Sequence, residues 1–298
     1  MNSRIELNKD KQKDIDREKH TEKVKKIVKK IVIFIIIIFL LVFFTFFYIT
    51  KIGTTSLIVN EEVIVNNKLP ESFSGLKVIQ FGDLHYNNNN TLLKSVVNAI
   101  TKRNPDLILF TGDLLSNDDL TSGDRKQLVK ELKKLDATLG KYAVLGESDN
   151  DEAISILVDC GFKVLDNSNE FIYNESNEAI MLVGLNTNDD TINYDEPFIN
   201  FNENTYTITI FHKPDYIDEF KGTYKVDLAL AGHSHLGEIR IPYLLNLASK
   251  DYASKYTNSY YEINNTKFYI TSGIGTDTYD VRINARPSIN FFRFRKTI

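Results

Sequence analysis

The sequence predicts an α/β domain with two packed sheets, preceded by one transmembrane helix. Apolar, β-branched runs alternate with amphipathic helical stretches along most of the chain. Continuous apolar runs of this kind are typical of strands buried on both faces of a sheet. Near the amino terminus, residues 31–50 carry no charge at all. The 298 residues leave room for one large globular domain in addition to this segment.

The uncharged segment has the length of a membrane anchor. At about 1.5 Å per residue, a helix of this length spans about 30 Å, the thickness of the hydrocarbon core of a bilayer. A buried helix of a soluble domain would have polar residues on one face, and this segment has almost none. A cleaved signal peptide has a shorter apolar region of about 7–15 residues and a small-residue cleavage site, which YITKIGTTS does not offer. We expect residues 31–50 to be an uncleaved transmembrane anchor.

The charges beside the anchor predict its orientation. Five lysines lie between residues 23 and 30, whereas only Lys51 lies close on the other side. Positively charged flanks remain in the cytoplasm. Residues 1–30 are therefore expected to form a charged cytoplasmic tail whose basic half could touch anionic lipid heads. Residues 51–298 would then form the domain outside the cytoplasm.

Net charge differs between the tail and the domain. Residues 1–30 hold 11 Lys and Arg against 6 Asp and Glu, which is +5, so the total of −4 leaves −9 for residues 51–298. An acidic domain lacks the basic surface that non-specific binding to nucleic acid requires. The single cysteine, Cys160, excludes an internal disulfide and a cysteine-based zinc site. We expect its thiol to be buried and inert.

Apolar runs and amphipathic stretches place the main elements. Strands are expected at residues 76–81, 106–112, 142–146, 179–185, 206–211, 227–232 and 267–273, after a short first strand within residues 51–70. Helices are expected at residues 91–103, 124–139 and 151–160, with Pro105 soon after the first and Gly140 closing the second. The later strands come with fewer helices, which favours two sheets packed on each other.

Potential metal ligands follow five of the expected strands. In chain order they are Asp83 and His85, Asp113, Glu147 and Asp149, His212, and His233 and His235. Four of the five histidines in the chain lie at such strand ends, where α/β sheets place their ligands. His-x-His alone is a weak signal, because histidines after a strand can be ordinary loop residues. The ordered set indicates a site.

Carboxylate and imidazole groups together suit a hard or borderline cation such as Mn²⁺, Fe²⁺ or Zn²⁺. Asp-x-His, as at residues 83–85, directs two side chains from one strand end to one ion. Two ions about 3.5–4 Å apart, bridged by a carboxylate, can hold both oxygens of an in-line phosphoryl displacement, and a bound hydroxide then serves as the nucleophile. This chemistry is that of a phosphohydrolase.

The motifs resemble those of the calcineurin-like metallophosphoesterase superfamily in order and spacing. They are Asp83-x-His85, Gly112-Asp113, Gly146-x-x-Asp149, His212 and Gly232-His233-x-His235. The stretch GHSHLGEIRIP and the amino-terminal anchor resemble its membrane-bound bacterial branch. The resemblance covers about residues 54–295. It implies a four-layer α/β/β/α sandwich and a centre of two divalent metal ions (Mn, Fe or Zn).

The resemblance also implies how the ligands divide between the two ions. The first ion is held by Asp83, His85 and His235. The second is held by Glu147, His212 and His233, and Asp113 bridges both.

The third motif departs from the family pattern. The family has Gly-Asn-His-Asp, in which the Asn binds the second metal and the His assists as a general acid, whereas this chain has Gly146, Glu147, Ser148 and Asp149. Glu147 can replace the Asn as a ligand, but Ser148 cannot replace an imidazole as a proton donor. Asn150 offers an alternative alignment of the loop. The catalytic candidates are Asp113, Ser148 and Asp149.

Several residues outside the motifs are also candidates. Arg282 is the candidate for binding substrate through a bidentate phosphate contact, with a structural salt bridge or a solvated position as the alternative for it and for Arg286. Asn117 could support a ligand. Residues 272–275 could lean against the site or form a tight turn. Leu236 and Glu238, where the family usually has Gly and Gln, are expected to alter the substrate mouth.

These observations predict a membrane-anchored enzyme that cleaves a phosphomonoester or phosphodiester by hydroxide attack. Proximity to the bilayer favours a lipid-linked or cell-envelope-linked phosphoester as the substrate. Ser148 motivates the alternative of a catalytically weakened relative that binds metal or phosphorylated envelope ligands without efficient turnover. A structural membrane protein with incidental histidines is the third possibility. The metal, the choice between monoester and diester and the oligomeric state stay open.

Overall fold

A computed structural model describes residues 2–116, 120–188, 192–241, 251–277 and 279–297, with residues 2–10 described by their backbone alone. The expected candidate Asn117 lies outside the described residues. Contacts within the chain separate two units, Met1–Ile49 and Thr50–Ile298. Each unit is described by itself.

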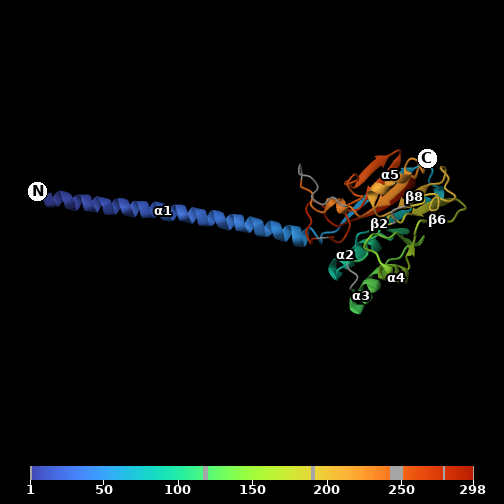
Figure 1. Cartoon of the computed structure of the whole chain (residues 1–298), viewed down its shortest axis with the longest axis horizontal. Helices are drawn as coiled ribbons and strands as arrows, with labels where there is room; N and C mark the ends of the chain where they lie inside the picture. Colours follow the sequence, from blue (N-terminus) through green and yellow to red (C-terminus); the bar gives the residue numbers. More distant parts are fainter. Residues whose placement is uncertain (1, 117–119, 189–191, 242–250, 278, 298) are drawn as a thin grey trace. The chain divides into compact units, whose positions relative to one another are not determined.

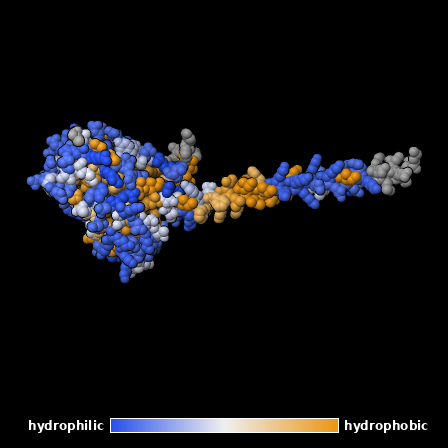
Figure 2. All heavy atoms as spheres, turned by 180° about the vertical axis from the view of Figure 1, so that it is seen from behind, coloured by the Kyte–Doolittle hydropathy of each residue, from blue (hydrophilic) through white to orange (hydrophobic). Residues whose placement is uncertain are grey.

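The first unit consists of one helix, α1 (Asn2–Phe47), and the start of a wider turn, Tyr48–Ile52, that continues past its end (Figure 1). The charged tail and the apolar segment are therefore parts of one helix. Figure 2 shows the apolar segment as a band of orange atoms beside the blue, charged part. Among the described helices it alone is long and apolar enough to cross a membrane, and its apolar side chains are exposed. Such an uncovered apolar surface suits lipid better than water.

Two six-stranded sheets form the second unit, counted over the described residues. The first has the order β1 (Ile58–Asn66), β12 (Ser288–Lys296), β2 (Lys77–Phe81), β3 (Leu107–Phe110), β4 (Lys141–Ala143) and β5 (Lys163–Val164). The second has the order β10 (Tyr260–Ile263), β11 (Thr266–Ile270), β9 (Leu228–Ala231), β8 (Thr207–Ile210), β7 (Ala179–Gly184) and β6 (Ser168–Tyr173).

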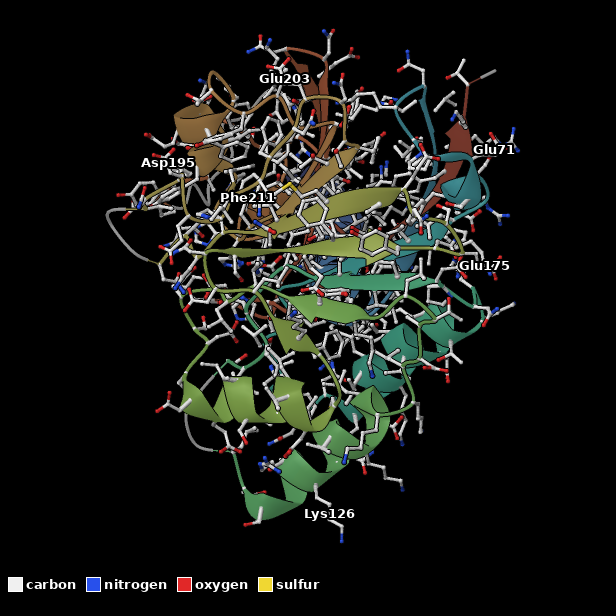
Figure 3. All side chains as sticks on the ribbon, turned by 90° about the vertical axis from the view of Figure 1, so that its right-hand side faces the viewer. Glu71, Lys126, Glu175, Asp195, Glu203 and Phe211 are labelled. Atoms are coloured by element: carbon white, nitrogen blue, oxygen red, sulfur yellow. The ribbon has the colours of Figure 1, made fainter. Side chains whose placement is uncertain are left out.

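The helices lie on the outer faces of the two sheets (Figure 1). On the first sheet, α2 (Asn90–Thr101), α3 (Ser122–Leu132) and α4 (Asp151–Asp159) share one apolar cluster with β2 and β3. On the second sheet, α5 (Ile217–Phe220) and neighbouring loops pack in another. Figure 3 shows Lys126 pointing outward from α3 and Phe211 lying against the second sheet. The predicted α/β/β/α class is confirmed, with a short outer layer on the second sheet.

Side chains alternate between the layers along each central strand. On β3, Ile108 and Phe110 face the helices, whereas Leu107 and Leu109 face the second sheet. On β9, Leu228 and Leu230 lie in the cluster between the sheets, and the alternate alanines lie in the outer one. Both faces of these strands are buried, since successive side chains point to opposite faces. This explains why the sequence shows unbroken apolar runs.

One expected helix is shorter than predicted. Residues 124–139 were expected to be helical, but α3 ends at Leu132. The chain then tightens, because the Leu135 amide donates to the Leu132 carbonyl at 3.0 Å, and the Asp136 carboxylate accepts a bond from the next amide at 3.0 Å. Such local side-chain bonds compete with the helical ladder. Leu135 nevertheless remains buried with the α3 side chains.

The strands that bear the candidate ligands run in parallel. β2, β3 and β4 pair in parallel in the first sheet, and β8 and β9 do so in the second. The loops that follow them therefore leave each sheet at one edge.

Candidate active site

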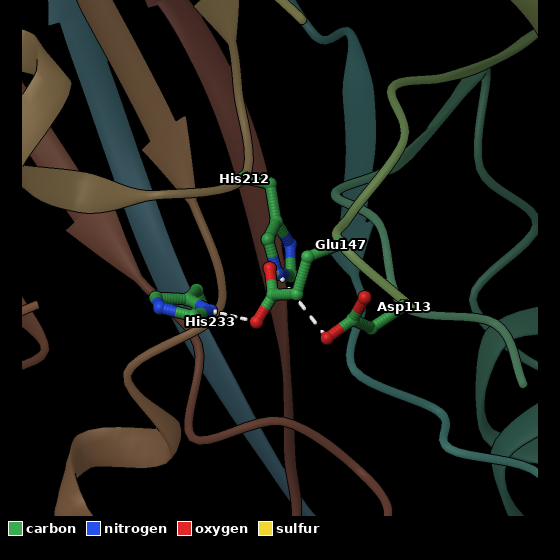
Figure 4. A group of neighbouring side chains, drawn as sticks. All are labelled: Asp113, Glu147, His212 and His233. Atoms are coloured by element: carbon green, nitrogen blue, oxygen red, sulfur yellow. Dashed lines mark ion pairs between the residues drawn. The ribbon is translucent and has the colours of Figure 1, made fainter. Parts of the chain in front are cut away.

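The candidate ligands come from strand-end loops of both sheets. Figure 4 shows Asp113 and Glu147 on loops of the first sheet, opposite His212 and His233 on loops of the second. Since the chain leaves parallel strands at the same edge, residues as far apart in sequence as His85 and His235, 150 positions from each other, meet here.

One group consists of Asp83, His85 and His235, whose potential ligand atoms all lie within 4.8 Å of one another. All three side chains are buried. His235 Nε2 lies 3.4 Å from Asp83 Oδ1 and 3.2 Å from His85 Nε2. Three nitrogen and oxygen atoms that converge at this spacing can share one cation.

The second group consists of Asp113, Glu147, His212 and His233, again within 4.8 Å. His212 Nε2 lies 3.3 Å from Asp113 Oδ2 and 3.0 Å from Glu147 Oε2. His233 Nδ1 lies 2.8 Å from Glu147 Oε1. Glu147 is the exposed member of the group, with 39% of its side chain accessible. It therefore lies where solvent reaches the site.

Asp113 Oδ2 lies between the two groups. It is 3.4 Å from His85 Nε2, in the first group, and 3.3 Å from His212 Nε2, in the second. The structure thus brings the seven residues into the same two sets that the resemblance implies, with Asp113 next to both.

Three buried atoms at this centre lie beside charged neighbours but form no hydrogen bond among the described residues. They are Asp113 Oδ2, His212 Nε2 and His233 Nδ1. An unsatisfied buried polar atom is destabilising, so native structures seldom retain one without a function or a missing ion. A divalent cation accepts such lone pairs, and the residues present therefore fit a metal site.

Outer partners fix the orientation of three histidine rings. His212 Nδ1 bonds to the Thr111 carbonyl at 2.7 Å, and His233 Nε2 bonds to the Asp251 carbonyl at 2.8 Å. His235 Nδ1 bonds to Glu238 Oε1 at 2.6 Å. Because each of these oxygens accepts a hydrogen bond from an N–H of the ring, the other ring nitrogen of a neutral imidazole carries the lone pair that can bind a metal.

The backbone at the ligands adopts an uncommon conformation. Five ligands have a positive φ, between 39° and 62°: Asp83, His85, Asp113, His233 and His235. This left-handed region costs on the order of 1–3 kcal/mol for a residue with a side chain, and such residues cluster at functional sites. Gly112, at φ 93°, lies so close to His212 that a Cβ there would be 2.6 Å from the ring Nδ1.

Opposite charges at the site shift the pKa values of its carboxylates and of His212 in opposite directions. Burial alone would raise the pKa of Asp83 and of Glu147, but neighbouring histidines more than offset this and hold both pKa values below the ordinary range. Burial would likewise lower the pKa of His212, but the carboxylates around it, Asp113 first, raise that pKa above its usual value. The carboxylates are thus ionised at neutral pH.

Residues 76–237 match the profile of the calcineurin-like phosphoesterase family. The chain belongs to this family. It is therefore a metallophosphoesterase, a hydrolase of a class that typically binds divalent metals.

Three relatives illustrate the family. The metallophosphoesterase YkuE of Bacillus subtilis is 30% identical, over 80% of this chain and 85% of its own. The UDP-2,3-diacylglucosamine pyrophosphatase LpxG of Chlamydia muridarum is 25% identical, over 59% of this chain and 69% of its own. A transmembrane protein with metallophosphoesterase domain of Danio rerio is 23% identical, over 78% of this chain and 56% of its own.

Asp149 binds backbone amides in this metallophosphoesterase. Its carboxylate accepts bonds from the amides of Asp113, Leu114 and Gly146 at 2.7–2.9 Å, which joins the loops after β3 and β4. Burial, together with the charge of Asp113, raises the pKa of Asp149 to about 6, although these amides oppose the shift. The neighbouring Ser148 amide donates to Asp113 Oδ1 at 2.9 Å.

Arg282 does not lie where a substrate-binding residue should. Its side chain is 1% exposed, and its guanidinium donates to the carbonyls of Ser272, Gly275 and Ala285. The guanidinium therefore holds these three carbonyls together, and its burial excludes the expected contact of Arg282 with substrate. Arg286 donates a hydrogen bond to the Ser56 carbonyl at 3.0 Å, which is a structural contact.

Residues 272–275 lie against the site, which is one of the two arrangements expected for them. The amides of Ile274 and Gly275 donate to the Asp83 carbonyl at 3.0 and 2.8 Å. A Cβ on Gly273, at φ 67°, would lie 2.7 Å from Asp83 Cβ, so only glycine fits this close approach.

Leu236 and Glu238, which were expected to alter the substrate mouth, are both buried. Leu236, 9% exposed, packs in the outer apolar cluster of the second sheet. Glu238, 7% exposed, bonds to His235. The spacing of three residues between His235 and Glu238 was the available signal in the sequence. The carbonyl partners of the other two rings have no such signal, because any residue has a carbonyl.

Replacing Asp149 by Ala should loosen both loops. Three amides would lose a charged acceptor, so we expect the free energy of unfolding of the metal-free chain to fall by about 2–4 kcal/mol. Urea denaturation of the full chain in mild detergent with EDTA measures this. Glu178→Ala, at an exposed carboxylate, is the control and should stay within about 0.5 kcal/mol of wild type. Equal stability of Asp149→Ala and wild type would contradict the loop-joining role.

Proposed function

We propose that this metallophosphoesterase is anchored in the membrane by α1 and hydrolyses a phosphomonoester or phosphodiester at a centre of two divalent metal ions. The observation that carries the proposal is Asp113 Oδ2, which lies within 3.4 Å of a histidine from each ligand group. One shared carboxylate between two groups is the arrangement that a two-metal site requires.

The candidate residues would have different roles at such a centre. Bound ions would polarise the phosphoryl group and lower the pKa of a water near the reacting phosphorus. Asp83, His85 and His235 would hold one ion, and Glu147, His212 and His233 the other. Asp113 would bridge them, while Asp149 holds the loop of Asp113 in place through three amides.

The choice of substrate is supported by the anchor and by one relative. LpxG is named as a pyrophosphatase of a diacylated nucleotide sugar, and α1 carries an exposed apolar segment of membrane length. Both favour a phosphoester linked to a lipid or to the cell envelope. The lysines before residue 31 favour a domain outside the cytoplasm.

Glu147 and Ser148 favour a second candidate, a weakened relative that binds metal or phosphorylated ligands with little turnover. Asp83, Asp113 and Glu147 supply three negative charges, one more than an Asn at position 147 would leave. A more neutral centre holds cations more tightly but polarises a phosphate less. Ser148 also lacks the imidazole of the family's general acid.

Wild-type protein should bind about two divalent ions per chain and hydrolyse generic phosphoesters with added Mn²⁺. In Asp113→Asn the shared ligand is weakened, so we expect metal content to fall and the rate to drop on the order of 10³-fold or more. Metal analysis and a phosphoester panel measure both quantities. Asp136→Asn, at an exposed carboxylate whose local bond an Asn can keep, is the matched control. A wild-type chain that binds no metal would refute the proposal.

Replacing Ser148 by His should restore a proton donor. Positioned proton transfer contributes typically 10²–10⁴-fold, and it weighs most for poor leaving groups. We therefore expect wild type to cleave nitrophenyl esters measurably and alkyl esters slowly, and Ser148→His to gain selectively on alkyl esters. Ser148→Ala is the matched control and should resemble wild type. Equal alkyl rates in Ser148→His and wild type, at equal metal content, would show that the proton comes from another group.

Protease added to intact cells tests the orientation. We expect it to remove residues 51–298 while a tag at the amino terminus stays protected, because the lysine-rich flank should remain in the cytoplasm. Detergent-permeabilised cells, in which both ends become accessible, are the control. Full protection of the domain in intact cells would reverse the proposed orientation.

A further inference from the structure

A buried carboxylate lies directly behind one of the candidate metal ligands. Glu238 Oε1 is 2.6 Å from His235 Nδ1, on the side of the ring away from Asp83 and His85. Glu238 follows the short 3₁₀ turn His235–Gly237 and is 7% exposed. Its charge is therefore largely withdrawn from solvent and directed at this histidine.

Several contacts hold Glu238 in place. The same Oε1 accepts a bond from the Asp277 amide at 3.0 Å. The Glu238 amide donates to the His235 carbonyl at 3.2 Å, and its carbonyl accepts from the Ile283 amide at 2.8 Å. The residue has a φ of 36°, a region that favours glycine. A strained residue with a fixed side chain is typical of functional sites.

The three oriented histidines differ in their outer partners. His212 and His233 donate to neutral backbone carbonyls, of Thr111 and Asp251, whereas His235 donates to a carboxylate. A carboxylate partner makes the imidazole a stronger metal donor than a carbonyl does and fixes its ring orientation. The group of Asp83, His85 and His235 contains one carboxylate, whereas the other group contains two. A stronger imidazole donor therefore adds more to the metal affinity of the first group than it would to that of the second.

We propose that Glu238 is a positioning residue that orients His235 and strengthens it as a ligand of the first metal. The inference rests on the proposed two-metal site, but it concerns one of the two ions alone. Removing the Glu238 carboxylate should lower the affinity of the chain for that ion. The affinity for the ion held by Glu147, His212 and His233 should not change.

Calorimetric titration of the EDTA-stripped full chain in detergent with Mn²⁺ tests this. In Glu238→Ala we expect one of two binding events to weaken about 10–100-fold, the range for lost outer partners of metal ligands. Glu238→Gln keeps an oxygen that can accept the Nδ1 proton but removes the charge, so it should recover part of the affinity. His235→Ala marks the event that belongs to this group, and Glu178→Ala, at an exposed carboxylate, should match wild type.

The outcomes separate the two proposals. Absence of Mn²⁺ binding in wild type would refute the two-metal site and this inference with it. If Glu238→Ala binds both Mn²⁺ ions with wild-type affinity while His235→Ala loses one binding event, the inference is refuted and the two-metal site is not. Equal weakening of both events with a lower unfolding temperature would show a merely structural role and also overturn it. If Glu238→Ala does not fold, Glu238→Gln decides, because an affinity equal to wild type in that variant would exclude a contribution of the charge.

Discussion

The buried carboxylate of Asp113 is the contact on which the candidate site depends. One of its oxygens faces His85, from the first sheet, and His212, from the second, at 3.4 and 3.3 Å. Its other oxygen accepts a bond from the Ser148 amide, which ties it to the loop of Glu147. Loops from both sheets thus meet at this one carboxylate. The parallel strands explain why the loops of each sheet reach this point together.

The surroundings of Asp113 combine several features that lower the stability of the fold, which is typical of a functional site. Carboxylates and imidazoles are buried there, several ligands hold left-handed backbone, and three polar atoms lack a hydrogen-bond partner within the described chain. Each of these features destabilises a folded chain. Asp149 opposes this by accepting hydrogen bonds from three backbone amides of the surrounding loops. A bound cation would remove most of the remaining penalty, so metal binding and folding of the site are expected to be linked.

The sequence predicts the parts of the molecule that local patterns determine. Apolar runs identify the central strands, and the polar residues directly after them identify every member of the two ligand groups. It does not reveal that β12 inserts between β1 and β2, because pairing between chain ends leaves no local signal. For the same reason Arg282, judged from its charge, was assigned to substrate, although its surroundings make it an anchor for carbonyls. Helix α3 was overextended because apolar periodicity continues through Leu135 beyond the last helical turn.

Arg282 and Glu238 are a buried cation and a buried carboxylate next to the candidate site. Burial lowers the pKa of Arg282 to about 10, a value at which the group is still a cation at neutral pH, and Glu238 and Asp83 oppose this shift. A buried cation therefore lies close enough to Glu238 to compensate its charge. That compensation allows a further carboxylate behind His235 at a smaller desolvation penalty than an isolated one would have. Glu147 has no such compensating arginine among the described residues, so it gives the centre more negative charge than the family's Asn at this position would. Such a centre favours firm retention of its ions over strong polarisation of a phosphate, which fits a chain that also lacks an imidazole at position 148.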